Sequence, residues 1–156
     1  MKKTLLLIFC LILSPYAYTS EINCLAKNIF WEAQDQSVSG MLAVADVTLN
    51  RVNDPRWPNT ICAVVEQRKW IGKKLICQFS WFCDGKSDSP KPGASQAFNL
   101  CYMIAELRLR NSDMSILPND VYWYHNDSVR PYWASAYSPY ATIGDHTFYS
   151  DIEYSF

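Results

Sequence analysis

The sequence predicts an α+β fold in which N-terminal helices are followed by short antiparallel strands. After residue 20, apolar residues recur at the three- and four-residue spacing of amphipathic helices. The last third is instead rich in β-branched and aromatic residues around a Gly-Asp turn. The 156 residues contain no repeat, low-complexity tract or linker, so we expect a small single domain.

The first twenty residues are expected to form a secretory signal peptide. Lys2 and Lys3 precede an apolar run over residues 4–13, and Ser14 and Pro15 break it. The run is too short to span a bilayer comfortably, so we expect no stable membrane anchor after cleavage. Residues 21–156 would then form the exported domain, in the periplasm or outside the cell.

The first helix is expected over residues 22–33. Its apolar face comprises Ile22, Leu25, Ala26, Ile29, Phe30 and Ala33. At about 100° per residue, Glu32 falls at the border of this face beside Leu25, whereas Trp31 and Cys24 lie on the other side. We therefore expect Glu32 to be partly shielded from water at the rim of the core.

Two further helices follow. Residues 39–52 are apolar on most sides, with Asp46 and Asn50 sharing one face, so this helix should be central. Pro55 and Pro58 then enforce a turn. Residues 95–110 form the third helix, whose buried stripe comprises Ala97, Phe98, Cys101, Ile104 and Ala105.

The strands are expected at the C-terminal end. Residues 121–125 (VYWYH) are β-branched and aromatic, and residues 141–149 (ATIGDHTFY) predict short extended segments around the Gly-Asp turn. Between helices and strands, residues 78–88 (QFSWFCDGKSD) are typical of a loop.

The cysteines suit an oxidising compartment. After signal removal they are Cys24, Cys62, Cys77, Cys83 and Cys101, an odd number, so at least one stays free or pairs with another chain. We favour Cys77–Cys83, and then Cys24 with either Cys62 or Cys101. The absence of a CxxC motif disfavours the alternative of a zinc site.

Composition and charge narrow the possible ligands. Removing Lys2 and Lys3 takes the basic residues from 14 to 12 against 15 acidic residues, a net charge of −3. That balance argues against a nucleic-acid partner. The many Tyr and Trp residues near polar loop residues suggest carbohydrate, unless they simply fill the core.

Glu32 is the leading candidate for a catalytic residue. A carboxyl group among apolar residues is costly to ionise, so its raised pKa would let it donate a proton to a glycosidic oxygen. The alternative is a surface glutamate paired with Lys27 or Lys69. A second acid could come from Asp35, Asp46, Asp84 or Asp88, and their spacing selects none of them.

His125 and His146 are the only histidines. A catalytic zinc needs about three protein ligands, and a third with suitable spacing is missing. We therefore predict no metal and no cofactor. Each histidine either contacts substrate or packs structurally.

Several stretches, in the same order, resemble SleB/CwlJ-type cell wall hydrolases. They are CLAKNIFWEAQ (24–34), MLAVADVTLNRVNDPRWPNTICAVV (41–65), CQFSWFCDGKSD (77–88), YHNDSVRPYW (124–133) and IGDHTFY (143–149). The resemblance covers nearly all of the chain after residue 20. It implies a lysozyme-like α+β fold and cleavage of peptidoglycan glycan strands at the cell wall.

The resemblance also implies site residues. Glu32 matches the family's catalytic glutamate. Many relatives continue Glu-Ala-Arg-Gly-Glu, whereas here Gln34, Asp35 and Gln36 follow Ala33, so the second family acid is replaced by Gln36. The substrate-binding candidates are Asn50, Trp81, Asp84, Tyr124, His125, Trp133 and His146.

The expected reaction is cleavage between N-acetylmuramic acid and N-acetylglucosamine by a lytic transglycosylase that uses one catalytic glutamate. The alternatives are an N-acetylmuramoyl-L-alanine amidase and a peptidoglycan-binding protein without catalysis.

Overall fold

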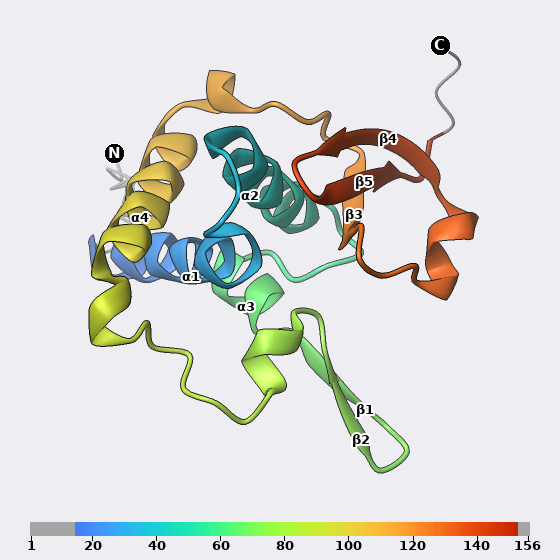
Figure 1. Cartoon of the computed structure of the whole chain (residues 1–156), viewed down its shortest axis with the longest axis horizontal. Coiled ribbons are helices and arrows are strands. Elements are labelled where there is room, and N and C mark those ends of the chain that lie inside the picture. Colours follow the sequence, from blue (N-terminus) through green and yellow to red (C-terminus); the bar gives the residue numbers. More distant parts are fainter. Residues whose placement is uncertain (1–14, 153–156) are drawn as a thin grey trace, which may run out of the picture.

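The computed structural model describes residues 15–152. Four α-helices are present in this range: α1 (Pro15–Ala33), α2 (Val38–Asn53), the short α3 (Ile61–Val65) and α4 (Ser95–Arg110). The helical body lies on one side of the molecule and a three-stranded sheet on the other (Figure 1). Short 3₁₀ turns lie in the connections, at Ser80–Cys83, Pro92–Ala94, Ser112–Met114 and Tyr132–Ala136.

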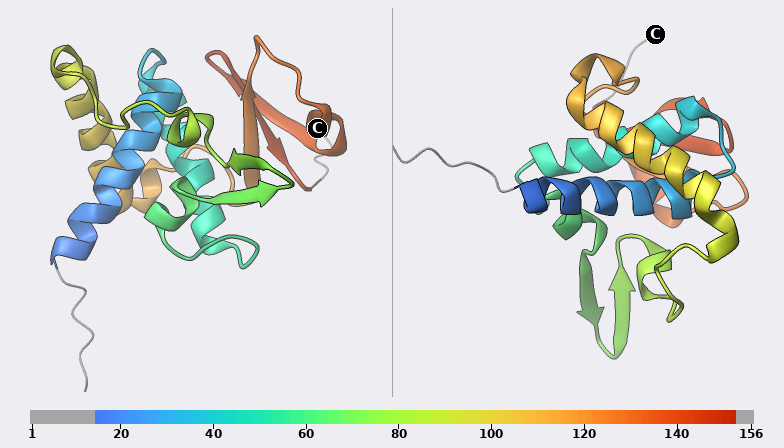
Figure 2. Two further views of the ribbon diagram at one scale, coloured as in Figure 1. Left: turned by 90° about the horizontal axis from the view of Figure 1, so that it is seen from below. Right: turned by 90° about the vertical axis from the view of Figure 1, so that its left-hand side faces the viewer.

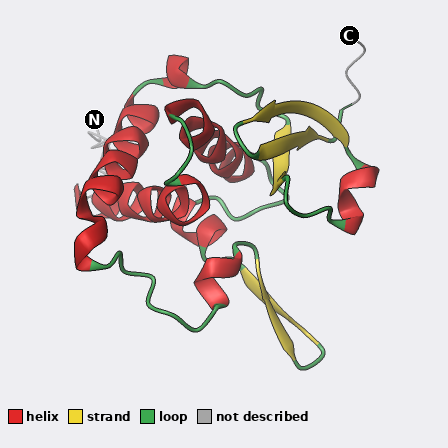
Figure 3. Cartoon of the chain, in the orientation of Figure 1, coloured by secondary structure: helices red, strands yellow, loops and turns green. Residues whose placement is uncertain are grey.

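The strands form two separate antiparallel sheets. β3 (Val121–Asn126), β4 (Ser138–Ile143) and β5 (His146–Ser150) pair in the order β3-β5-β4. β1 (Arg68–Ile71) and β2 (Lys74–Cys77) form a hairpin that projects away from the helices (Figures 1 and 3). The α+β prediction is thus confirmed.

The helices agree with the predicted ones except at the start of α1. α4 has the predicted bounds, and α2 is one residue longer at each end, with the Ser37 hydroxyl accepting the Gly40 N–H as its N-cap. α1 begins at Pro15 rather than at residue 22, because proline suits a first helical turn and no breaker follows it. The predicted signal peptide therefore overlaps α1 at residues 15–20, and its remainder lies outside the described residues.

The sequence pattern predicts neither the short helix α3 nor the β1–β2 hairpin. All four residues of β1 are exposed, so the strand shows no alternation between an apolar and a polar face. The C-terminal prediction is closer: Gly144, at φ +60°, makes the turn between β4 and β5, a conformation that glycine adopts without strain.

α2 packs between two cores, which explains its apolar composition. On one side it meets α1, α3 and α4 through residues such as Leu42 and Val44. On the other side Ala43 and Val47 pack against the sheet residues Val121 and Phe148. None of the helices within residues 15–152 is long and apolar enough to cross a membrane.

Two disulfides connect the elements. Cys24–Cys62 joins α1 to α3, and Cys77–Cys83 closes the segment after β2. The favoured pairing of Cys77 is confirmed, and Cys62 rather than Cys101 is the partner of Cys24. Cys101 is a free thiol buried in the core, and burial raises its pKa to about 11, so it is neither exposed for pairing with another chain nor reactive.

Candidate active site

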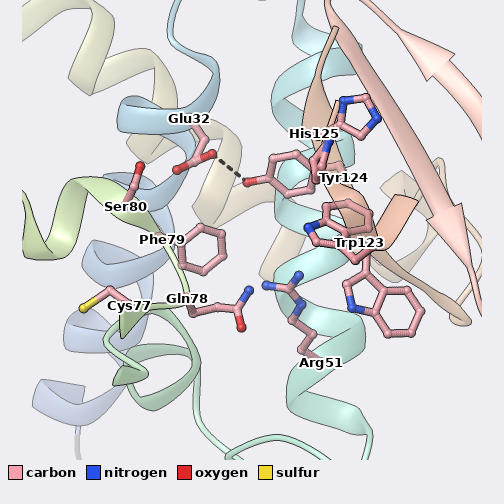
Figure 4. A pocket seen from close by; sticks show the side chains of 11 residues that line it. Glu32, Arg51, Cys77, Gln78, Phe79, Ser80, Trp123, Tyr124 and His125 are labelled. Atoms are coloured by element: carbon pink, nitrogen blue, oxygen red, sulfur yellow. Dashed lines mark hydrogen bonds between the residues drawn. The ribbon is translucent and has the colours of Figure 1, made fainter. Parts of the chain in front are cut away.

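A cavity of about 410 Å³ lies where the helices meet the sheet. α1 contributes Glu32 and α2 contributes Arg51, and the other residues come from two segments (Figure 4). Its remaining lining residues are Cys77, Gln78, Phe79, Ser80, Trp123, Tyr124, His125, Pro131 and Trp133. Glu32 is the only carboxylate among the residues that line it.

Glu32 is half-buried at the end of α1, as its place on the helix predicts. The Tyr124 hydroxyl donates a hydrogen bond of 3.0 Å to its Oε2 atom (Figure 4). Burial raises the pKa of Glu32, while this hydrogen bond and the positive charge of Arg51 partly oppose the rise. Because Tyr124 donates to Oε2, the proton of the neutral acid belongs on Oε1.

Arg51 is the cation that acts on Glu32, rather than Lys27 or Lys69. Its side chain is only 3% exposed and its Nε donates to the Tyr122 carbonyl at 2.8 Å, which fixes the guanidinium. Burial lowers the pKa of Arg51 to about 10, so it stays charged at neutral pH. Its Nη1 atom is buried without a hydrogen-bond partner, which leaves a donor for a ligand.

Tyr124 and His125 follow one another on β3. Burial and the neighbouring Glu32 raise the pKa of Tyr124 well above its usual value, so it acts as a hydrogen-bond donor. The His125 Nδ1 lies 3.0 Å from the Asn126 carbonyl and its Nε2 lies 2.9 Å from the Tyr149 hydroxyl. Both ring nitrogens are therefore occupied within the protein, although His125 lines the cavity.

The other predicted site residues lie apart from this cavity. Trp81 and Asp84 line a separate hollow of about 170 Å³ beside Trp31. Asn50 is buried and donates to the Pro118 and Val121 carbonyls at 2.7 and 2.9 Å, so its amide holds the start of β3. His146 is buried beneath Tyr124, with ring centroids 5.4 Å apart.

The candidate second acids also lie elsewhere. Asp46 is fully buried and accepts bonds from Arg108 and from the Ile116 and Leu117 N–H groups. Asp35 is exposed, and neither it nor Asp88 lines the cavity. Within residues 15–152, no three His, Cys, Asp or Glu side chains are placed to hold a metal ion.

Sequence reasoning missed Arg51, Gln78, Ser80 and Trp123. For Arg51 a signal was present, because a cation in an otherwise apolar central helix needs a buried partner. The other three line the cavity because the segment after β2, which carries Gln78 and Ser80, lies opposite β3, which carries Trp123 (Figure 4).

Gln36, which replaces the second family acid, holds two turns together. Its Oε1 accepts the Asp145 N–H at 3.0 Å, and its Nε2 donates to the Asp145 carboxylate at 3.1 Å and to Asp35 at 3.3 Å. Gly144 has no side chain to obstruct this contact. The amide thus connects the α1–α2 turn to the β4–β5 turn, and it does not line the cavity.

We therefore expect Gln36→Glu to lower stability without adding activity. A carboxylate at this position would lose the donated bonds and face two acidic groups, at a cost of roughly 1 kcal/mol. Chemical unfolding at neutral pH measures the change, and Gln34→Glu, an exposed neighbour with the same charge change, is the control. Faster peptidoglycan cleavage by Gln36→Glu would show instead that position 36 can supply a catalytic acid.

Fold and site together define a small α+β domain that holds one protonatable carboxyl group at the base of an aromatic cavity. Comparison with known proteins identifies the family: the cell wall hydrolase family matches residues 35–149, and the chain belongs to it. The match begins three residues after Glu32, so it does not include the candidate acid. A spore cortex-lytic enzyme of Bacillus subtilis is 37% identical over 46 residues, which are 30% of this chain and 15% of that protein.

Two solved structures share the fold. The catalytic domain of the germination-specific lytic transglycosylase SleB from Bacillus anthracis superposes with a TM-score of 0.60 at 23% identity, over 88% of this chain and 98% of that one. The catalytic domain of the Bacillus cereus SleB protein superposes with a TM-score of 0.57 at 23% identity, over 83% of this chain and 89% of that one. The predicted family and fold are thus confirmed.

Proposed function

We propose that this cell wall hydrolase cleaves peptidoglycan glycan strands between N-acetylmuramic acid and N-acetylglucosamine as a lytic transglycosylase, with Glu32 as its catalytic residue. The observation that carries the proposal is a single carboxyl group with a raised pKa in the cavity. A glycosidase that uses a second carboxylate as nucleophile or base would need another acid near Glu32.

The reaction can proceed with one acid that later acts as a base. Neutral Glu32 donates its proton to the glycosidic oxygen as the bond from that oxygen to C1 of the muramic acid breaks. The 6-hydroxyl oxygen of the same sugar bonds to C1, and its proton passes to the ionised Glu32. The product carries a 1,6-anhydro ring, and Glu32 ends neutral again.

Arg51 and Tyr124 fit this cycle. Glu32 is negative only between the two proton transfers, when the Arg51 charge and the Tyr124 hydroxyl stabilise it most. Burial favours the neutral form before and after. Trp123 and Trp133 supply flat apolar surfaces on which sugar C–H faces can stack, and His125 lines the same cavity.

Export would place the enzyme at its substrate. The predicted signal peptide over residues 1–20, the two disulfides and membership of the cell wall hydrolase family support action at the wall, in the periplasm or outside the cell.

Mass spectrometry of the soluble products from purified peptidoglycan tests the proposal. We expect fragments with anhydro-muramic ends, each lighter than its hydrolysed counterpart by the mass of one water molecule. Reducing ends alone would show hydrolysis by water, and freed stem peptides would show an amidase. Binding without any soluble product would indicate a protein that binds the wall without cutting it.

A further inference from the structure

The β1–β2 hairpin carries charge that folding does not explain. Arg68, Lys69, Lys73 and Lys74 are exposed cations within ten residues that contain no acid, in a chain of net charge −1. None of the four is in an ion pair among the described residues, although Arg68 lies over the Phe82 ring at 5.7 Å. The hairpin projects from the body in Figure 1 and in the right-hand view of Figure 2.

The base of the hairpin borders a second cavity. Lys69 pairs with Ile76 across the strands and Ile71 pairs with Lys74, so these four side chains share one face, which we call the hairpin face. Lys69 and Ile76 of this face line the second cavity, as do Arg68 and Cys77 of the opposite face.

The second cavity, of about 620 Å³, continues from the first. Both are lined by Cys77, Gln78, Trp123 and Trp133. A ligand that occupies the first cavity can therefore extend directly into the second. Trp57, Tyr132 and Tyr137 form the rest of its aromatic wall.

The chemistry of the second cavity suits a peptide better than a sugar. No acid lines it, while Arg68 and Lys69 do, so its charge is positive. The side-chain oxygen of Gln67 is buried in its wall without a hydrogen-bond donor. Peptides supply N–H donors and carboxylates together, whereas neutral sugar hydroxyls have no need of cations.

We propose that the second cavity and the hairpin face bind the peptide stem that peptidoglycan carries on its muramic acid. Lys69 and Lys74 pair with stem carboxylates, and Gln67 accepts a stem amide N–H. This inference rests on the proposed function, because a glycan in the first cavity is what presents the stem to the second. It makes the enzyme selective for strands that still bear their peptides.

Binding measurements test the proposal independently of cleavage. Glu32→Gln, expected to be inactive, is titrated calorimetrically with a soluble tetrasaccharide of the glycan strand that bears its stems, and with the same fragment after amidase treatment. Amidase hydrolysis frees the lactyl carboxylate that the stem amide had masked, so the treated fragment gains this acid. Tighter binding of the stem-bearing fragment therefore cannot come from the lactyl carboxylate and reports the stem. We expect the stem-bearing fragment to bind at least about tenfold tighter at low salt, and this preference to fall as salt rises.

Charge-reversal variants test which residues cause the preference for the stem-bearing fragment. In the Glu32→Gln protein, Lys69→Glu and Lys74→Glu together should reduce this preference to less than about threefold. Lys91→Glu, at an exposed lysine outside both cavities, should leave it unchanged. Equal affinity for the two fragments would overturn the proposal, and binding of anionic phospholipid vesicles in their place would assign the hairpin to a membrane surface. Failure of the wild-type protein to cleave either fragment, with the binding preference of the Glu32→Gln protein intact, would instead contradict the proposed function.

Discussion

Glu32→Gln is expected to reduce the release of soluble fragments from purified peptidoglycan by roughly 10²- to 10⁴-fold, the contribution of a positioned acid–base group. The amide oxygen can accept the Tyr124 hydrogen bond, but the amide has no acidic proton to transfer to a glycosidic oxygen. Turbidity loss of a peptidoglycan suspension measures the rate. Glu66→Gln, an exposed glutamate outside both cavities, is the control and should keep wild-type activity.

The same variant is expected to be more stable than the wild type at neutral pH. The pKa of Glu32 is raised in the folded protein, so between its ordinary value of 4.5 and the raised value the folded state binds more protons than the unfolded state. Wild-type stability therefore falls as the pH rises through this window, and glutamine removes that loss. Melting temperatures should be similar near pH 4 and diverge as the pH rises.

Two results would contradict this account of Glu32. Near-normal activity of Glu32→Gln would remove the residue from the catalytic role. A melting temperature below that of the wild type at every pH would show that the carboxylate stabilises the fold, as the alternative of a paired surface glutamate requires.

Asp46→Ala is expected to destabilise the protein by about 3–5 kcal/mol, the cost of breaking a buried ion pair. The Asp46 side chain is 0% exposed and its Oδ1 lies 2.6 Å from the Nε of Arg108, whose side chain is 12% exposed. Its Oδ2 accepts the N–H groups of Ile116 and Leu117 at 2.7 and 3.0 Å. Alanine would leave a buried cation and two backbone donors without their acceptor.

The midpoint of urea unfolding measures this cost. Glu106→Ala, which removes the partner of Arg110 in an exposed pair, is the matched control and should cost less than about 1 kcal/mol. Asp46→Asn keeps one acceptor oxygen, so its loss of stability should lie between those of Asp46→Ala and Glu106→Ala. A folded Asp46→Asn with the wild-type midpoint but without activity would make Asp46 catalytic rather than structural.

Local pattern predicts much of the helical part. Helical spacing places α2 and α4 within one residue at each end, and it places Glu32 at the rim of the core because the angle between residues is set by the helix itself. The same reasoning does not predict where α1 begins or that the β1–β2 hairpin forms. No helix breaker after Pro15 marks the start of α1, and β1 has no buried face that would impose an alternating pattern.

The candidate site is harder to predict because its members are distant in the chain. Tyr124 is 92 residues from Glu32 in the sequence, and Arg108 is 62 residues from Asp46. Local pattern indicates that Arg51 needs a buried partner, but it does not show that the guanidinium enters the cavity while the Asn50 amide holds β3.

By itself, then, the sequence determined the α+β class, the central helix, the short disulfide and the one acid set beside apolar residues, all of which depend on neighbours in the chain. Only the tertiary structure decided which groups surround that acid, that Gln36 holds two turns together, and that a cationic hairpin continues the cavity. These depend on contacts between segments brought together by burial of the two cores on α2, and local spacing marks which face of a segment is buried but not which other segment covers it.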